Sequence, residues 1–243
     1  MNKLRAILVG SRPWSFPMTL VSVFTGTLLA ANAGKIGPIK LLFVVLGTVL
    51  FHGATNLAND YYDYASGVDT DESPTAKYRD QPLLEEWVEP GELRFLFAIL
   101  YFFVAVIGGY LTYLSGLPVL GFGLGGFVAS FLYTGGGLQY KYLGWGELSV
   151  FLVWGPLMVS GSYYVQTGAV SWRPVLVSIP IGLLVALVLL ANNLRDRTYD
   201  GDAGVNTIAT LLDEKDGLIV YFLLVMVTYS VLGYLIVGGI LSL

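Results

Sequence analysis

The chain has 243 residues, of which 55% are hydrophobic and only 12% are charged, and its mean hydropathy is +0.69. A soluble domain carries about twice that charged fraction, so the composition excludes an ordinary water-soluble fold. The absence of cysteine excludes disulfides, thiolate catalysis and cysteine-ligated metals, and the single histidine, His52, excludes a metal site built from several imidazoles.

Apolar residues fall into seven runs of about 20 residues, the length with which a helix crosses ~30 Å of hydrocarbon. A membrane β-barrel would show alternating segments of about 10 residues, and none is sustained here. The fold class is therefore predicted to be all-α, a polytopic bundle of transmembrane helices. In chain order, the predicted spans are 14–33, 39–57, 93–115, 117–134, 148–166, 175–194 and 218–241.

Charged residues are distributed unequally between the two sides of this predicted bundle. The side with the N-terminus and the loops after spans two, four and six receives ten of the 13 basic residues, and the positive-inside rule places it in the cytoplasm. All 17 acidic residues fall on the same side. We therefore expect an integral protein of the cell membrane whose active site faces the cytoplasm, with the lipid bilayer as a partner and no nucleic acid. The oligomeric state is not predicted.

Two segments of the chain resemble each other and indicate an internal repeat. The second span ends in HGATNLANDYYDYASGVDTD, and the sixth ends in LLANNLRDRTYDGDAGVNT. When Asn56 is superposed on Asn192, Asp60 meets Asp196, and a further acid follows in each segment. This pattern is typical of two similar helical bundles joined in tandem. We predict a single domain, 1–243, with halves of about 12–134 and 135–243 around a central cavity.

The spacing of these polar residues predicts a metal site, because residues at i, i+3 and i+4 share one face of a helix. Two such stripes that face each other would bring four carboxylates and two amides together, and oxygen ligands of this kind favour Mg²⁺ shared with a substrate phosphate. The alternative is that these acids are solvated residues beyond two helix ends. The predicted metal ligands are Asn56, Asp60, Asp63, Asn192, Asp196 and Asp200.

Basic residues near the stripes are candidates for contacts to a diphosphate, although each could also be a surface cation that sets topology. Lys141 is the best of them, because it follows the flexible glycine run after Tyr133 at a membrane surface. At most one of Arg195 and Arg197 is expected to line the site, since they point to different helix faces from Asp196. The predicted diphosphate contacts are Asn56, Asn59, Lys77, Arg79, Lys141, Asn192 and Arg197.

These segments resemble the UbiA superfamily of intramembrane aromatic prenyltransferases, and within it most closely the menaquinone branch, which includes the 1,4-dihydroxy-2-naphthoate prenyltransferases. The strings that carry the resemblance are RPWSFP at 12–17, NLANDYYDYASGVDT at 56–70, YTGGG at 133–137, YLGWGELSVFLVWGPL at 142–157, YYVQTG at 163–168 and NNLRDRTYDGDAGVNTIA at 192–209. They extend over most of the chain between residue 12 and about residue 210.

The resemblance implies roles for single residues. Asn56, Asp60 and Asp63 match the first metal motif, and Asn192, Asp196 and Asp200 match the second. Lys141 is similar to a basic residue that the family places after its fourth helix, and Tyr133 to the tyrosine before it. Two features depart from the family pattern. A third acid of the first motif stands at Asp69, where many members place it at the position of Gly67, and seven spans are counted where the family has nine.

The function implied is Mg²⁺-dependent transfer of a prenyl group from a prenyl diphosphate to an aromatic acceptor, such as a quinone precursor in menaquinone biosynthesis. The resemblance assigns catalytic roles to Asp60, Asp63, Asp196, Asp200, Lys141 and Tyr133. Two alternatives stay open: a related enzyme with a non-quinone acceptor, such as a glycerol-phosphate ether lipid, and a non-enzymatic transporter. A transporter would place ionisable groups in mid-membrane, whereas the acids here stand at span ends.

Overall fold

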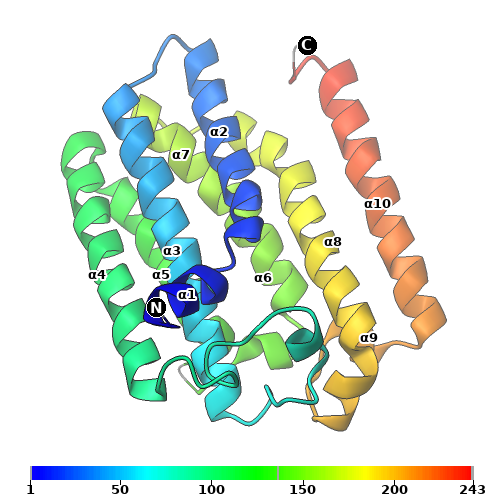
Figure 1. Ribbon diagram of the computed structural model, residues 1–243. Coiled ribbons are helices and arrows are strands. Elements are labelled where there is room, and N and C mark those ends of the chain that lie inside the picture. Colours follow the sequence, from blue (N-terminus) through cyan, green and yellow to red (C-terminus); the bar gives the residue numbers. More distant parts are fainter. Residues whose placement is uncertain (1, 136, 242–243) are drawn as a thin grey trace.

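Helices make up most of the computed structural model, which describes residues 2–135 and 137–241 (Figure 1). Prolines stand in the first turn of α3, α4 and α5, where the missing N–H costs no hydrogen bond. In chain order, the elements are α1 (Asn2–Gly10), η1 (Pro13–Ser15), α2 (Phe16–Asn32), α3 (Pro38–Ala65), η2 (Pro74–Lys77), α4 (Pro90–Ser115), α5 (Pro118–Thr134), η3 (Tyr140–Tyr142), α6 (Gly146–Leu152), η4 (Val153–Leu157), α7 (Met158–Thr167), α8 (Trp172–Asp202), α9 (Ile208–Leu211) and α10 (Glu214–Val237).

The predicted all-α membrane bundle is confirmed. Six helical stretches of the described chain are long and apolar enough to cross a membrane, and each matches a predicted span. The remaining predicted span, 117–134, forms α5, a helix of 17 residues at the short end of the spanning range. The chain is therefore an integral membrane protein. The division into two tandem halves around a central cavity stays a prediction.

Two helices continue beyond their predicted ends, and this places the acid stripes on helical surface. The predicted second span stopped at residue 57, but α3 continues to Ala65. Likewise α8 continues to Asp202, well past the predicted end at 194. The apolar run predicts only the part of a helix that lies in hydrocarbon. The helix itself continues through polar turns that contact other parts of the protein.

Glycines allow the helices at the centre of the bundle to approach closely. A Cβ at Gly26 of α2 would overlap the carbonyl oxygen of Val159 in α7. A Cβ at Gly182 of α8 would lie 2.6 Å from the carbonyl oxygen of Phe151 in α6. The same region of α8 packs against the break at η4, where Gly155 has φ −81° and ψ −106° before Pro156. Small residues thus set the spacing of α2, α7 and α8, as is usual in membrane helix packing.

One end of the bundle gathers α1, the segment 66–89, the loop before α6 and α9 (Figure 1). Arg5 of α1 donates to Asp80 at 2.7 Å, and its guanidinium lies 4.2 Å from the centre of the Trp87 ring. Leu143 pairs with Asn206 in an isolated bridge, which ties the loop before α6 to the loop before α9. The loops that were predicted to share one side of the membrane therefore do share one end of the bundle.

The opposite end satisfies its basic residues with backbone carbonyls. Lys40 donates to the Val165 carbonyl at 3.0 Å, and Arg173 donates through Nε to the Ile240 carbonyl at 3.1 Å. Both acceptors lie at or after the last turn of a helix, where unpaired carbonyls carry partial negative charge. Polar chemistry that needs carboxylates is therefore confined to the other end.

Replacing Gly26 by Ala tests the close approach of α2 and α7. We expect a loss of about 1–3 kcal/mol in unfolding free energy, because the new methyl group has no room beside Val159. The measurement is thermal or denaturant-induced unfolding of the purified protein in detergent. Gly109→Ala in α4 is the control, since nothing lies within 4 Å of its Cβ position, and it should be neutral or slightly stabilising. Equal stability of the two variants would contradict the packing.

Candidate functional site

Asp60 lies near the polar end of α3 and is paired with two arginines. Its side chain is only 3% exposed. Arg79, from the segment after α3, donates to both carboxylate oxygens at 2.7 and 3.1 Å, and Arg12 donates to one of them as well. A buried carboxylate is stable only when it is paired in this way. Asp60 is thus a fixed centre of charge that holds two separate loops.

Arg12 reaches Asp60 from a strained turn between α1 and α2. Its backbone adopts the left-handed conformation, with φ 55° and ψ 61°, immediately before Pro13. Asn56 helps to hold the turn, because its amide donates to the Ser11 carbonyl at 2.8 Å. The Arg12 guanidinium keeps one buried donor, Nε, without a hydrogen-bond partner within the described chain. An unpaired buried donor next to a carboxylate is a place where a ligand oxygen can bind.

Asp63, one turn further along α3, collects a second group of donors. Lys141 donates to its Oδ1 at 2.5 Å and to the Asn59 amide oxygen at 2.9 Å. The Asn59 amide nitrogen donates to the other Asp63 oxygen at 2.8 Å, and the Tyr142 hydroxyl donates to Oδ1. Burial and the adjacent Asp63 charge raise the pKa of Tyr142, so its hydroxyl keeps its proton and stays a donor. Asn59 thus orients both Asp63 and Lys141.

Asp69 joins the two aspartates from the loop after α3. Burial, together with the negative charges of Asp63 and Asp60, raises the pKa of Asp69 to about 6. Burial and the charge of Arg12 also lower the pKa of Arg79, although Asp60 opposes that change. The negative charge gathered around Asp69 favours the binding of a further cation.

The acid segment of α8 meets the loop after α3. The Tyr199 hydroxyl donates to the Val68 carbonyl at 2.9 Å and lies 2.9 Å from the Thr70 hydroxyl. Arg195 lies over the Tyr78 ring, 4.5 Å from its centre. Asp200, which follows Tyr199, belongs to this segment. The two distant segments that were predicted to converge are therefore side by side.

A metal cage is not preformed among the described side chains, and the predicted ligand set stays a prediction. Within the described residues, no group of three or more acidic or histidine side chains lies close enough to hold a metal ion. The physical reason is that the carboxylates pair with nearby cations; even Asp196 accepts from Arg195 at 2.6 Å. The oxygen donors have the right chemistry for Mg²⁺, but they are held by Arg and Lys. The predicted six were Asn56, Asp60, Asp63, Asn192, Asp196 and Asp200.

Three predicted residues lie away from this cluster. Asn192 is exposed and lines a recess between α8 and α10 beside Tyr221 and Tyr229. Arg197 donates through Nε to the Ala209 carbonyl at 2.9 Å, so it braces α9. Lys77 is exposed and makes no ion pair within the described part of the chain. The structure therefore gives no support to these three as contacts of a diphosphate.

Tyr133 lies next to the site. The Lys141 ammonium lies 5.8 Å from the centre of the Tyr133 ring and 4.7 Å from that of Tyr142. Gly137 has φ 78°, a conformation that glycine adopts without strain. Gly136, in the middle of the predicted run, lies outside the described residues. Tyr133 thus borders Lys141 without contacting an aspartate.

Two residues of this cluster, Tyr142 and Arg12, are not among the predicted site residues, whereas Asp69 was expected as a third acid of the first motif. The prediction gave Arg12 no role at the site. Its signal in the sequence is weak, because the Arg-Pro pair indicates a turn but not the direction of the side chain. Tyr142 follows Lys141 directly, and the 3-10 turn η3 brings both side chains to Asp63. Only the tertiary structure shows that contact.

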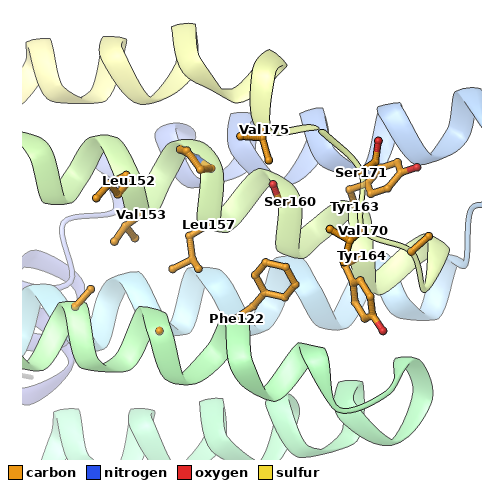
Figure 2. Close-up of a pocket in the computed structure, with 14 residues that line it drawn as sticks. Phe122, Leu152, Val153, Leu157, Ser160, Tyr163, Tyr164, Val170, Ser171 and Val175 are labelled. Atoms are coloured by element: carbon orange, nitrogen blue, oxygen red, sulfur yellow. The ribbon is translucent and has the colours of Figure 1, made fainter. Parts of the chain in front are cut away.

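An apolar cavity of about 460 Å³ lies between α5, the α6–α7 span and the start of α8 (Figure 2). Figure 2 shows Phe122 and Leu157 pointing into the space between their helices, with Tyr163, Tyr164 and Ser171 near one end. The cavity offers room for hydrocarbon rather than for a charged group, because its lining is almost entirely apolar.

Comparison with known proteins gives a consistent result. The model of the UbiA prenyltransferase family matches residues 19–243. UbiA prenyltransferase domain-containing protein 1 of Rattus norvegicus is 35% identical over 234 residues, which covers 95% of this chain and 68% of the relative. Its counterpart from Homo sapiens is 34% identical over 238 residues, covering 96% of this chain and 69% of that protein.

Two solved structures share the fold. A structure of digeranylgeranylglyceryl phosphate synthase is similar with a TM-score of 0.71 at 17% identity, covering 100% of this chain and 81% of that one. A UbiA homologue from Archaeoglobus fulgidus, bound to GPP and Mg²⁺, also gives a TM-score of 0.71, at 15% identity, with coverages of 94% and 77%. At these identities the likeness establishes the fold alone.

The raised pKa of Asp69 sets a pH dependence of stability. Its ordinary value is 3.8 and its value in the fold is about 6, so the folded protein binds more protons than the unfolded chain between these values. Stability contributed by Asp69 is therefore full below about pH 4 and is lost as the pH rises to about 6. We expect the melting temperature of Asp69→Asn, relative to wild type, to rise over this range and then stay constant.

The measurement is thermal unfolding in detergent without divalent metal, at several pH values. Asp71→Asn is the control, because Asp71 is exposed in the same loop. A difference between the Asp69 variant and wild type that does not change with pH would contradict the assignment.

Proposed function

The chain belongs to the UbiA prenyltransferase family, and we propose that it transfers a prenyl group from a prenyl diphosphate to an acceptor held within the membrane. The observation that supports this most directly is the contact between the two acid segments. Tyr199 of α8 donates to the loop after α3, which places the acid segment of α8 beside the segment that follows Asp63. A transporter has no comparable need for matched acid segments at one membrane surface, and family membership argues against that alternative.

Magnesium is the metal that fits the site. Its ligands in this proposal are Asp60, Asp63, Asp196 and Asp200, which offer oxygen atoms only. Bound Mg²⁺ would neutralise the diphosphate and make it a better leaving group. The homologues from Archaeoglobus fulgidus that share this fold are bound to DMAPP or GPP together with Mg²⁺, which supports the choice.

The cations of the chain provide the remaining contacts to the diphosphate. Lys141, Arg79 and Arg12 already stand within hydrogen-bond distance of the carboxylates. With a metal-bound diphosphate in the site, the carboxylates would hold the metal, and the ammonium and guanidinium groups would donate to phosphate oxygens. The net charge of the buried site changes little in such an exchange, so the cost of desolvation stays small.

The apolar bundle supplies the other requirement of the reaction. As the bond between the allylic carbon and the diphosphate oxygen breaks, positive charge develops on the prenyl group, and a carbon of the acceptor forms the new bond and then loses its proton. Water would intercept such a cation, and a closed apolar environment excludes it. The cavity beside Phe122 and Leu157 is suited to hydrocarbon and is our candidate for housing part of an isoprenoid chain.

For the acceptor we propose an aromatic quinone precursor. The support is the set of strings that resemble the menaquinone branch, above all NLANDYYDYASGVDT and NNLRDRTYDGDAGVNTIA. A glycerol-phosphate ether lipid is the second candidate, because digeranylgeranylglyceryl phosphate synthase shares the fold over the whole of this chain. We further propose that the site faces the cytoplasm, on the basis of the basic residues at that end.

An acceptor panel tests the proposed function. Purified protein is incubated with Mg²⁺, one fixed prenyl diphosphate and either 1,4-dihydroxy-2-naphthoate, a benzenoid phenol or geranylgeranylglyceryl phosphate. We expect a prenylated aromatic product and release of diphosphate. Product from the glycerol compound alone would favour the second candidate, and no product with any acceptor would contradict prenyl transfer.

Asp200→Asn tests the role of the α8 segment. We expect turnover to fall by at least about 100-fold, because one metal ligand loses its charge. Folding should be retained, since Asp200 makes no ion pair within the described structure. Asp202→Asn, exposed two residues further on, is the matched control and should keep activity. Both are measured as Mg²⁺-dependent diphosphate release, and full activity of the Asp200 variant would contradict the ligand set.

Lys141→Ala is expected to raise the KM for the prenyl diphosphate about tenfold or more, because a charge-assisted hydrogen bond to phosphate is lost. The KM for the acceptor should change little. Lys77→Ala is the control: Lys77 is also a lysine of this end of the bundle, but it is exposed and outside the cluster. An unchanged diphosphate KM in the Lys141 variant would show that this lysine is structural.

A further inference from the structure

The single histidine of the chain lies inside the bundle, two helical turns before Asp60 on α3. His52 is 7% exposed and has a partner at each ring nitrogen. Its Nδ1 is 2.8 Å from the Thr19 hydroxyl, and its Nε2 is 3.2 Å from the Ser15 hydroxyl. The proposed reaction does not use His52, so its hydrogen bonds to Ser15 and Thr19 need a separate explanation.

One direction of hydrogen bonding satisfies every donor and acceptor around His52. The indole of Trp154 can only donate, and it donates to the Thr19 hydroxyl at 3.1 Å. At the other end, the Ser15 hydroxyl donates to the Arg12 carbonyl at 2.7 Å, so it has to accept from the ring. A neutral His52 ring with its proton on Nε2, whose Nδ1 accepts from Thr19, satisfies each of these groups. In this arrangement every donor hydrogen of the network makes one hydrogen bond.

This network of hydrogen bonds ends at Arg12, the residue of the site with a strained backbone. The Arg12 carbonyl accepts from both the side chain and the backbone N–H of Ser15, the latter at 2.9 Å. Arg12 is the left-handed residue, with φ 55°, whose guanidinium pairs with Asp60. A non-glycine residue stays in that conformation only when its surroundings hold it there. The hydrogen bonds from Ser15, which His52 orients, are such a restraint.

We propose that His52 is a positioning residue: acting through Ser15, it fixes the left-handed turn at Arg12 and thereby directs the unpartnered Arg12 Nε toward an anionic oxygen of the substrate. The inference rests on the proposed function for the nature of that substrate. The anionic oxygen belongs either to the diphosphate or to an acidic group of the acceptor, and kinetics with each substrate varied in turn separates the two.

A buried histidine with two partners could also serve stability alone. That reading predicts that a substitution lowers the melting temperature and the activity independently of Arg12. The positioning reading predicts instead that the loss of activity depends on Arg12 being present. The two readings are separable by experiment.

The hydrogen-bond chain is tested first, without any assay of activity. Because His52 is the only histidine, ¹⁵N-histidine labelling of the intact protein in detergent gives a single ring to observe. We expect a neutral ring with an unprotonated Nδ1 and a protonated Nε2, and a shifted Nε2 signal in Ser15→Ala. A charged ring, or the opposite tautomer, would overturn the proposal.

Kinetics then test the coupling to Arg12. We expect His52→Leu to lower kcat/KM for one of the two substrates about tenfold, the effect of a lost hydrogen bond and a misplaced charge. His52→Gln should restore most of it, because the amide again offers one acceptor and one donor. In an Arg12→Gln background, His52→Leu should cost less than about twofold more.

Equal losses from His52→Leu with and without Arg12 would contradict the positioning role and leave a structural histidine. The same holds if His52→Gln fails to recover activity although it folds with the wild-type melting temperature. Inactive wild-type protein would instead contradict the proposed function itself, and the labelled ring would still report whether the chain to Arg12 exists.

Discussion

Pairing of buried carboxylates with cations from other parts of the chain is the interaction on which the polar end of this bundle depends. Asp60 is almost inaccessible to solvent, and Arg79 and Arg12 both donate to its carboxylate. Leaving either charge alone in such surroundings is expected to cost several kcal/mol. The arginines come from two different loops, so one aspartate ties together α3, the turn before α2 and the covering segment, residues 66–89.

Apolar side chains next to these charges join the same parts of the chain as the ion pairs do. A core cluster joins α1, α3, the covering segment and the start of α4 directly beneath Asp60, and its members are Ala6, Leu57, Ala58, Leu83, Val88, Leu93 and Phe97. Gly10 is part of this contact, since a Cβ there would lie 2.6 Å from the Leu57 side chain and 3.7 Å from an Asp60 oxygen. The covering segment is thus held by hydrophobic burial as well as by ion pairs. A site closed in this way can exclude water from a reactive cation.

Much of this arrangement could be predicted from the sequence, because the signals concerned are local. Apolar runs of spanning length predict the helices, and the i, i+4 spacing of Asp60 and Asp196 with their asparagines identifies two helical faces. Lys141 was predicted as a contact of the site and does bind Asp63. What could not be predicted depends on long-range geometry. Asn192 has the same spacing as Asn56, but the rotation of α8 directs it to the recess beside α10. Arg12 and Tyr142 reach the acids only because turns aim them there.

If the proposed function holds, the same charge pairing lets the protein fold stably before metal and substrate bind. Burial, and then repulsion from the neighbouring carboxylates Asp63 and Asp60, raise the pKa of Asp69. Arginine and lysine neutralise them at the strongest points, Asp60 and Asp63, and leave Asp69 and Asp200 without ion pairs in the described structure. The site therefore keeps some unneutralised negative charge to attract a metal, and it already contains the cations that a diphosphate requires. In this proposal, stability and substrate binding draw on one set of ion pairs, so the residues that hold the loops closed are also those that exchange partners when the substrate binds.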